Sequence, residues 1–352
     1  DRTKAIETYT SIGKVAGKGK RDEEARFRLA DVFLQMNEVD RAVDTYRSLI
    51  RDYPQSPRRD AYAYNIGVIY HERERDSVAV MELKNFLITF PESELLPQAH
   101  FTIGDAYYNM GGYDSAYVWY YSVLEKYPNS TVVPEAIDQV RFTLEALGRG
   151  REAVAVIDSF MVRNPNRLPA DSLSFKKAGI LFDNGAYPEA IVEYRELIAG
   201  FPQTPLRPEA LFQIGRSYEY INQQDSGVLT YTEVITDFPQ SPAAAQALLA
   251  RATIRLYNRA WDQAAADFGL LLGRFPESSR ATEARFGLGE ARLGIADTAG
   301  AVAQFRIIID SAGSAGEGDL IFTDKSRLMI GRILSAQKKS DSALAITAPI
   351  VS

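Results

Sequence analysis

The stretch TDFPQSP, from Thr236 to Pro242, occurs almost unchanged much earlier in the chain as RDYPQSP, from Arg51 to Pro57. When the sequence is aligned with itself, the proline of this stretch recurs every 37 residues. The seven prolines are Pro54, Pro91, Pro128, Pro165, Pro202, Pro239 and Pro276. A fixed period of this length is typical of structural units that stack on one another. We therefore divide the chain into repeats.

A column of small residues accompanies the prolines. Each proline is preceded, twelve residues earlier, by Ala or Gly, and the column continues one repeat further. Its members are Ala42, Ala79, Ala116, Ala153, Ala190, Gly227, Ala264 and Ala301. Large apolar residues follow at helical spacing, as Tyr194 and Leu197 follow Ala190. We predict that this helix is the second of each repeat, that its small residues admit a neighbouring backbone, and that the proline ends it.

Another helical pattern lies between each proline and the next small column. Gly or Ala recurs there in one phase, with a large residue three positions later, as Tyr107 follows Gly104. The members are Ala30, Gly67, Gly104, Ala178, Gly215, Ala252 and Gly289. Arg141 falls in the same column, which predicts a local change in how the repeats stack.

Most of the loops carry a hydroxyl residue two positions after the proline. These residues are Ser56, Ser93, Ser130, Thr204, Ser241 and Ser278. A hydroxyl N-cap followed by proline, as at Ser241 and Pro242, is a strong signal for the start of a helix. We predict that each loop ends one helix and that its hydroxyl residue caps the next.

These columns resemble the tetratricopeptide repeat, which has a pair of small residues, paired aromatics and a closing proline. The pattern is clearest in ALFQIGRSYEYINQQDSGVLTYTEVITDFP, from Ala210 to Pro239, and it extends over essentially the whole chain. The resemblance implies an all-α fold, a right-handed α-α superhelix of about nine helix pairs preceded by half a repeat.

The long period and the YPxS or FPxS loops are similar to those of bacterial envelope proteins of this family. These include the lipoprotein of the outer-membrane β-barrel assembly machine and the periplasmic coordinator of the Tol-Pal system. This similarity implies a location in the bacterial periplasm or cell envelope, and a cytoplasmic location stays open.

The repeats predict one solenoid over residues 1–352. We expect a half repeat over 1–19, regular repeats over 20–310, an irregular connection rich in Gly, Ala and Ser over 311–324, and a last helix pair over 325–352. Gly313 stands where a proline is due, so the connection is either a tolerated insertion or a hinge or contact loop. The sequence starts in mid-repeat and stops before a closing proline, which suggests an excerpt of a longer chain.

The composition argues against several classes of function. The net charge of −6 and the pI near 5.3 offer no basic face for nucleic acid, which a helical-repeat RNA-binding protein would also need. The chain has no cysteine, and its two histidines, His71 and His100, lie in different repeats and phases. No apolar run is long enough to span a membrane. We find no catalytic or metal-binding constellation and expect no enzyme activity and no cofactor.

The resemblance implies that the first helices line a concave groove and that ligands contact its aromatic residues. The candidate partner-binding residues on this face are Phe27, Tyr64, Phe101, Tyr108, Phe175, Phe212, Arg216 and Phe286. Exposed rings in a row would form a binding surface, because aromatic anchors carry much of the energy at interfaces. The alternative is that these rings pack between neighbouring repeats.

We therefore expect a non-enzymatic scaffold or adaptor that binds one or more partner proteins or peptides, as a possible member of a multiprotein complex. The alternative is a sensor or substrate-recruiting arm of a larger enzyme or regulator whose active domain lies outside these residues. The basic and asparagine residues with which the chaperone-binding members hold a terminal carboxylate are missing here, so we do not expect binding of chaperone tails.

Overall fold

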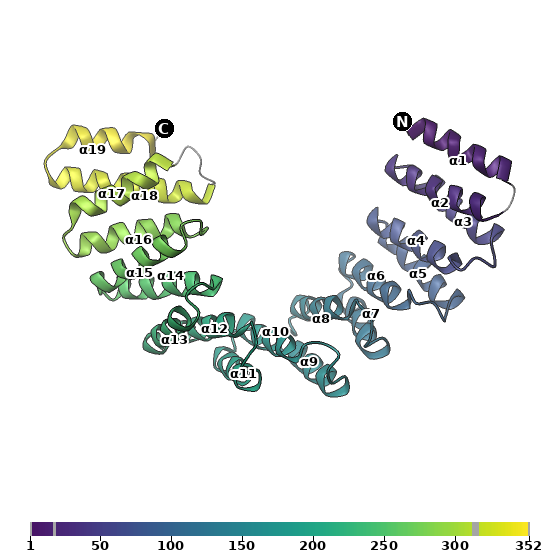
Figure 1. Cartoon of the computed structure of the whole chain (residues 1–352), viewed down its shortest axis with the longest axis horizontal. Helices are drawn as coiled ribbons and strands as arrows, with labels where there is room; N and C mark the ends of the chain where they lie inside the picture. Colours follow the sequence, from purple (N-terminus) through teal and green to yellow (C-terminus); the bar gives the residue numbers. More distant parts are fainter. Residues whose placement is uncertain (1, 17–18, 312–316, 351–352) are drawn as a thin grey trace. The chain divides into compact units, whose positions relative to one another are not determined.

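The computed structural model describes residues 2–16, 19–311 and 317–350. This part of the chain forms nineteen α-helices and one short 3-10 helix, without a β-strand (Figure 1). Its contacts divide the chain into two compact units, Asp1–Leu173 and Ser174–Ser352, where the sequence predicts one solenoid. The all-α class is confirmed.

Unit 1 begins with a single helix, which is followed by helix pairs. Its helices are α1 (Arg2–Ala16), α2 (Lys20–Gln35), α3 (Val39–Asp52), α4 (Arg59–Glu72), α5 (Asp76–Thr89), α6 (Leu96–Asn109), α7 (Tyr113–Lys126), α8 (Val133–Ala146) and α9 (Glu152–Arg163). Helix α1, at the start of the chain, corresponds to the second helix of the half repeat that the sequence predicts.

Unit 2 continues the same alternation, and α10 (Ala170–Asp183) crosses the boundary between the units. The other helices are α11 (Tyr187–Gly200), α12 (Arg207–Tyr220), α13 (Gln224–Asp237), α14 (Pro242–Tyr257), α15 (Trp261–Arg274), α16 (Ala281–Gly294), α17 (Thr298–Ser311), α18 (Glu317–Ala336) and α19 (Ser340–Thr347), followed by the 3-10 helix Ala348–Ile350.

Consecutive helices pack against each other within each unit, as α4 does on α5 and α14 on α15. The even-numbered helices, which are the first helices of the repeats, also contact one another across repeats. Such contacts join α4 to α6 in unit 1, and α12 to α14, α14 to α16 and α16 to α18 in unit 2. In each unit the even-numbered helices joined by these contacts share one surface, which we call the first-helix face.

The small columns lie where the sequence places them. All eight small residues of the second helices are buried, as are the large residues that follow them. The first-helix glycines face these large residues directly. A Cβ on Gly104 would lie 2.6 Å from the Tyr120 ring, and one on Gly215 would lie 2.4 Å from the Tyr231 ring. The glycines are there because the aromatic ring of the second helix occupies the space of a side chain.

The turn between the two helices of a repeat has a left-handed residue at a constant register. Positive φ angles occur at Asn37, Glu74, Gly111, Gly148, Gly185, Asn222, Arg259, Ala296 and Lys338. The backbone closes each first helix in the same way, as the N–H of Glu38 donates to the carbonyl of Phe33 at 2.8 Å. Only three of the nine residues are glycine, so composition alone does not reveal this turn.

The loop prolines follow the ends of the second helices as predicted, because the helical conformation is disfavoured for the residue before a proline and a proline has no N–H group for the helix. The preceding aromatic, such as Tyr53 with ψ 62°, is the C-cap. The prediction for the hydroxyl residues is correct only at Ser241, which caps α14 by accepting the N–H of Ala244 at 3.1 Å.

The other hydroxyl residues lie one turn before their helices. Ser56 accepts the N–H of Arg58 at 3.1 Å, whereas α4 begins at Arg59. The same bond to the residue two positions on is made by Ser93, Ser130, Thr204 and Ser278. These side chains close a tight turn that leads into the helix.

The expected irregular connection is shorter than the sequence indicated. Residues 317–324 belong to α18, and the last helix pair therefore starts at Glu317 instead of residue 325. Residues 312–316, which include Gly313, lie outside the described residues. Beyond this point the repeat register is displaced, because the left-handed residue of the last pair is Lys338.

Candidate functional site

The predicted aromatic residues of unit 1 attach the first helices to the second helices. The rings of Phe27 and Tyr46 lie 6.1 Å apart, those of Tyr64 and Phe86 5.9 Å, and those of Phe101 and Tyr120 5.4 Å. Each of the three predicted rings is partly buried. They belong to the packing between the two helices of one repeat and are only partly exposed to solvent.

Unit 2 repeats this arrangement. Phe175 packs on Tyr194 at 5.4 Å, Phe212 on Tyr231 at 5.7 Å, and Phe286 on Phe305 at 5.4 Å between ring centroids. Phe212 and Phe286 are only 8% and 9% exposed.

The rings therefore do not form a freely exposed row, and the first and last of them also contact the next repeat. Phe27 lies 6.0 Å from Tyr62, and Phe286 lies 5.7 Å from Phe322. Packing between neighbouring repeats, which was the alternative, is seen at these two residues.

Two tyrosines of the second helices extend past a glycine of the first helix, so that their hydroxyl groups reach carboxylates of the first helix. The Tyr120 hydroxyl passes Gly104 and donates to the Asp105 carboxylate at 2.6 Å. The Tyr231 hydroxyl passes Gly215 in the same way and donates to Glu219. Burial raises the pKa of Asp105 and of Glu219, although each hydroxyl donor opposes this shift.

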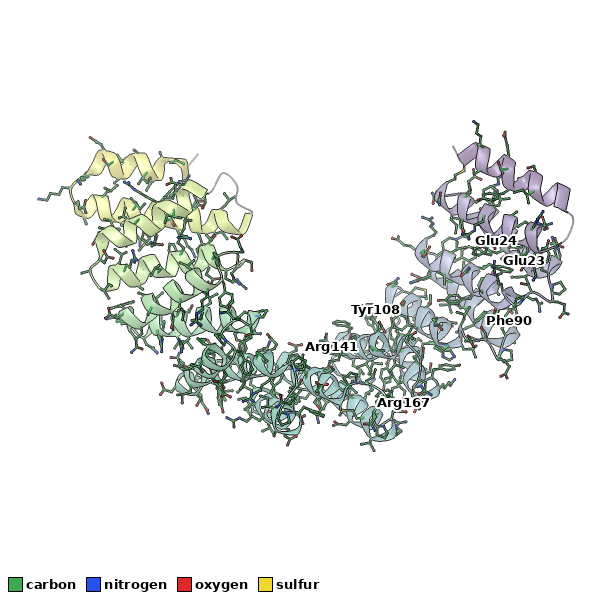
Figure 2. All side chains as sticks on the ribbon, viewed as in Figure 1. Glu23, Glu24, Phe90, Tyr108, Arg141 and Arg167 are labelled. Atoms are coloured by element: carbon green, nitrogen blue, oxygen red, sulfur yellow. The ribbon has the colours of Figure 1, made fainter. Side chains whose placement is uncertain are left out.

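The remaining two predicted residues, Tyr108 and Arg216, lie in different units. Tyr108 is partly buried against Tyr113, with ring centroids 5.1 Å apart. Figure 2 shows it on α6, along the same edge of unit 1 as Arg141 on α8. Arg216 on α12 lies over the Phe182 ring at 4.7 Å and donates to Gln213 at 3.1 Å.

The first-helix face of unit 2 contains a groove of about 1,120 Å³. Its floor is α14, one wall is α12, and the other wall is the loop that leads into α16. We call it the α14 groove. The lining residues from the helices include Phe212, Arg216, Glu219, Tyr231, Ala245, Gln246, Leu249, Ala250, Thr253 and Glu283, and those from the end of α15 and the loop include Arg274, Phe275, Glu277 and Arg280.

The groove exists because α14 has shorter side chains than its neighbours at the same register. Leu249 stands where α12 has Phe212, and Thr253 stands where α12 has Arg216. The row from Ala245 through Leu249 to Thr253 lines the groove at helical spacing. A helix with small side chains between two helices with larger ones leaves a hollow in the shared face.

No cluster of three or more His, Cys, Asp or Glu side chains that could hold a metal ion occurs among the described residues. His71 pairs with Asp76 at 2.6 Å, and His100 is buried and contacts Ser122 at 2.6 Å. Within the same residues, none of the helices has the length and apolar character needed to cross a membrane.

Comparison with known families agrees with the repeat register. The family model described as "Tetratricopeptide repeat" matches residues 24–56, 98–130 and 209–241. Each match starts in a first helix and ends at a loop hydroxyl residue. The chain contains tetratricopeptide repeats.

Solved structures of other tetratricopeptide repeat proteins have a similar fold. The C-terminal part of a TPR repeat-containing protein from Cytophaga hutchinsonii shares 14% identity, with a TM-score of 0.50, over 74% of this chain and 98% of that one. A tetratricopeptide repeat protein from Parabacteroides merdae shares 17% identity, with a TM-score of 0.39, over 76% and 98%.

A third structure, the complex of the TPR2AB domain of yeast Sti1 with pHSP90, shares 14% identity, with a TM-score of 0.31, over 78% and 99%. No curated protein matches the sequence. At 14% identity, the similarity to the Cytophaga hutchinsonii structure shows the fold and nothing finer.

Within this tetratricopeptide array the sequence predicted two residues of the α14 groove, Phe212 and Arg216, and missed its floor. The signal was present, since Leu249 interrupts the aromatic column of unit 2. A smaller residue in the column indicates a hollow only when the larger side chains of the neighbouring helices are known to project beyond it.

Proposed function

We propose that this protein is a non-enzymatic scaffold that binds a segment of a partner protein in the α14 groove. The observation that carries the proposal is the groove itself, a hollow of about 1,120 Å³ with a partly apolar floor on the face shared by the first helices. Surface hollows with apolar walls and a few fixed polar groups are the usual sites of recognition. Tetratricopeptide repeats are generally non-catalytic and bind proteins or peptides.

The setting that we propose is a protein complex of the bacterial cell envelope, with the chain in the periplasm. The support for this part is the 37-residue period together with the aromatic-proline-polar-serine loops. Both features resemble the long repeats of bacterial envelope proteins of this family.

The groove can be tested with a random dodecamer peptide library selected on the whole chain. The key variant is Ala245→Trp, which fills the groove from its floor. The matched control is Ala266→Trp on α15, where the alanine is exposed and does not line the groove. Equal melting temperatures would show that both variants fold.

Selected peptides that bind the parent chain and Ala266→Trp but not Ala245→Trp would support the groove as the binding site. Peptides that bind both variants equally well would place the site elsewhere, and a selection without enriched peptides would contradict a peptide-binding groove.

A further inference from the structure

The charged side chains around the α14 groove differ in the partners that they have within the described part of the chain. On the wall that leads into α16, Arg280 pairs with Glu283 at 3.2 Å. On the opposite wall, the Glu219 carboxylate accepts the hydroxyl of Tyr231. These three groups already have partners within the chain.

The other charges of the lining are Arg274 and Glu277 at the exposed mouth, and Arg216 deeper in the groove. Arg274 and Glu277 have opposite signs and are both hydrated, so together they favour neither sign of ligand. Arg216 is partly buried, so water screens its charge less than it screens the charges of Arg274 and Glu277. A segment bound in the groove would therefore interact most strongly with the charge of Arg216.

The Arg216 guanidinium is oriented and forms no ion pair within 4.0 Å among the described residues, although its charge opposes the rise in the pKa of the Glu219 carboxyl on the same helix. The Phe182 ring supports one face at 4.7 Å, and one N–H group donates to Gln213 at 3.1 Å. A guanidinium has five N–H donors in a planar fork that matches a carboxylate, and the hydrogen bond to Gln213 uses one of them.

The floor beside Arg216 is apolar and favours an apolar side chain of the bound segment. Ala245, Leu249 and Ala250 form a surface of short apolar side chains that is partly shielded by the walls. A bulky apolar side chain placed there removes its own surface and that of the floor from water, which is the main source of binding energy at such sites.

We infer that the α14 groove recognises a partner segment in which a bulky apolar residue packs on Ala245 and Leu249 while a nearby Asp or Glu pairs with Arg216. This inference rests on the proposed function and specifies the chemistry of its partner. A basic segment would bring like charge against Arg216. A purely apolar segment would bury the guanidinium without a counter-ion, which is costly.

The test uses the same dodecamer library and the whole chain, and it adds variants at Arg216. Arg216→Glu inverts the charge, and Arg216→Gln removes it without adding repulsion to Glu219. The control is Arg306→Glu, because Arg306 is exposed on α17 outside the groove. We expect enriched peptides to carry Asp or Glu within one helical turn of Leu, Ile, Met, Phe or Trp.

A synthetic peptide of the enriched sequence should bind Arg216→Glu and Arg216→Gln about tenfold or more weakly than the parent. It should bind Arg306→Glu as well as the parent. A peptide with Lys in place of its acidic residue should recover affinity for Arg216→Glu, which a variant that merely misfolds would not show.

The possible failures are distinct. Peptides that Ala245→Trp blocks but that lack an acidic residue, or that ignore both Arg216 variants, would overturn this inference and leave the proposed groove intact. Peptides that ignore Ala245→Trp, or a library without any enriched sequence, would overturn both.

Discussion

At the scale of single residues, glycines in the first helices leave space in which aromatic rings of the second helices pack, and this contact joins the two helices of a pair. Gly215 makes room for Tyr231, and the ring in turn carries its hydroxyl to Glu219 on the first-helix face. The recurrence of Gly and Ala in one column made this contact predictable from the sequence. The hydrogen bond to the carboxylate was not, because it depends on where the tyrosine emerges.

Gly215→Ala should therefore destabilise the protein by about 1–3 kcal/mol, since its methyl group would overlap the Tyr231 ring. Gly269→Ala is the matched control. Gly269 is also within a helix, but a Cβ there meets no atom within 4 Å. That change should be neutral or raise stability by up to about 1 kcal/mol. Denaturant unfolding of both variants measures the two free energies, and equal effects would contradict this packing.

His100 makes the stability of unit 1 depend on pH. Burial, and then the charge of Lys126, lower its pKa from 6.5 to about 4. Between these values the unfolded chain binds more protons than the folded chain. The contribution of this group is thus complete above pH 6.5 and is lost as the pH falls towards 4.

We expect the unfolding free energy to fall by about 1–2 kcal/mol from this group alone when the pH drops from about 7 to about 5. Carboxyl groups also titrate near this range, so the measurement compares the parent chain with His100→Gln. The variant should lose less stability over the same interval. Identical pH profiles would mean that His100 titrates alike in both states.

At the scale of helices and turns, the sequence predicted the second helices almost completely and the first helices less well. Proline fixes where a second helix ends, and the signal lies in a single residue. The start of a first helix depends on competing hydrogen bonds, and Ser56 closes a turn where a helix cap was expected. The turn inside each repeat was not predictable, because residues such as Glu74 and Ala296 do not signal a positive φ.

Ala296→Gly should stabilise the protein by about 1 kcal/mol, because glycine adopts the left-handed conformation without a steric cost. Ala296 has a φ of 63° and is exposed, so the substitution removes no packing. The reverse change, Gly148→Ala, should cost a similar amount at the equivalent turn of unit 1. Thermal melting of the two variants decides this, and shifts in the same direction would contradict the shared turn geometry.

An ion network connects three consecutive helices of unit 2. Arg251 binds Asp267 through two hydrogen bonds of 2.9 and 2.7 Å, Arg255 joins at 2.6 Å, and Arg251 also donates to Thr232 at 2.8 Å. Arg251 and Asp267 are 8% and 4% exposed. Removal of one partner would leave the others buried and charged.

Asp267→Ala should cost about 3–5 kcal/mol, whereas Asp262→Ala at an exposed position of the same helix should change stability little. Urea unfolding compares the two variants. A small loss for Asp267→Ala would mean that water reaches the two arginines.

At the scale of the whole molecule, a regular array acquires the α14 groove through one helix that differs from its neighbours. The repeat columns predicted the architecture because each residue in them has the same neighbour in every repeat. The α14 groove arises from a difference between neighbouring repeats, namely Leu249 and Thr253 against the larger residues of α12. Sequence periodicity reveals what the repeats share, and the groove comes from residues in which they differ.

The most direct test of the α14 groove is site-specific photo-cross-linking in the native cells. A photoreactive amino acid replaces Gln246, which is exposed and lines the groove, or Gln263, which is exposed on α15 outside it. We predict a discrete cross-linked partner at position 246 that is absent at position 263 and is lost when Arg216→Glu is added. The same products from both positions, or products from position 263 alone, would contradict it.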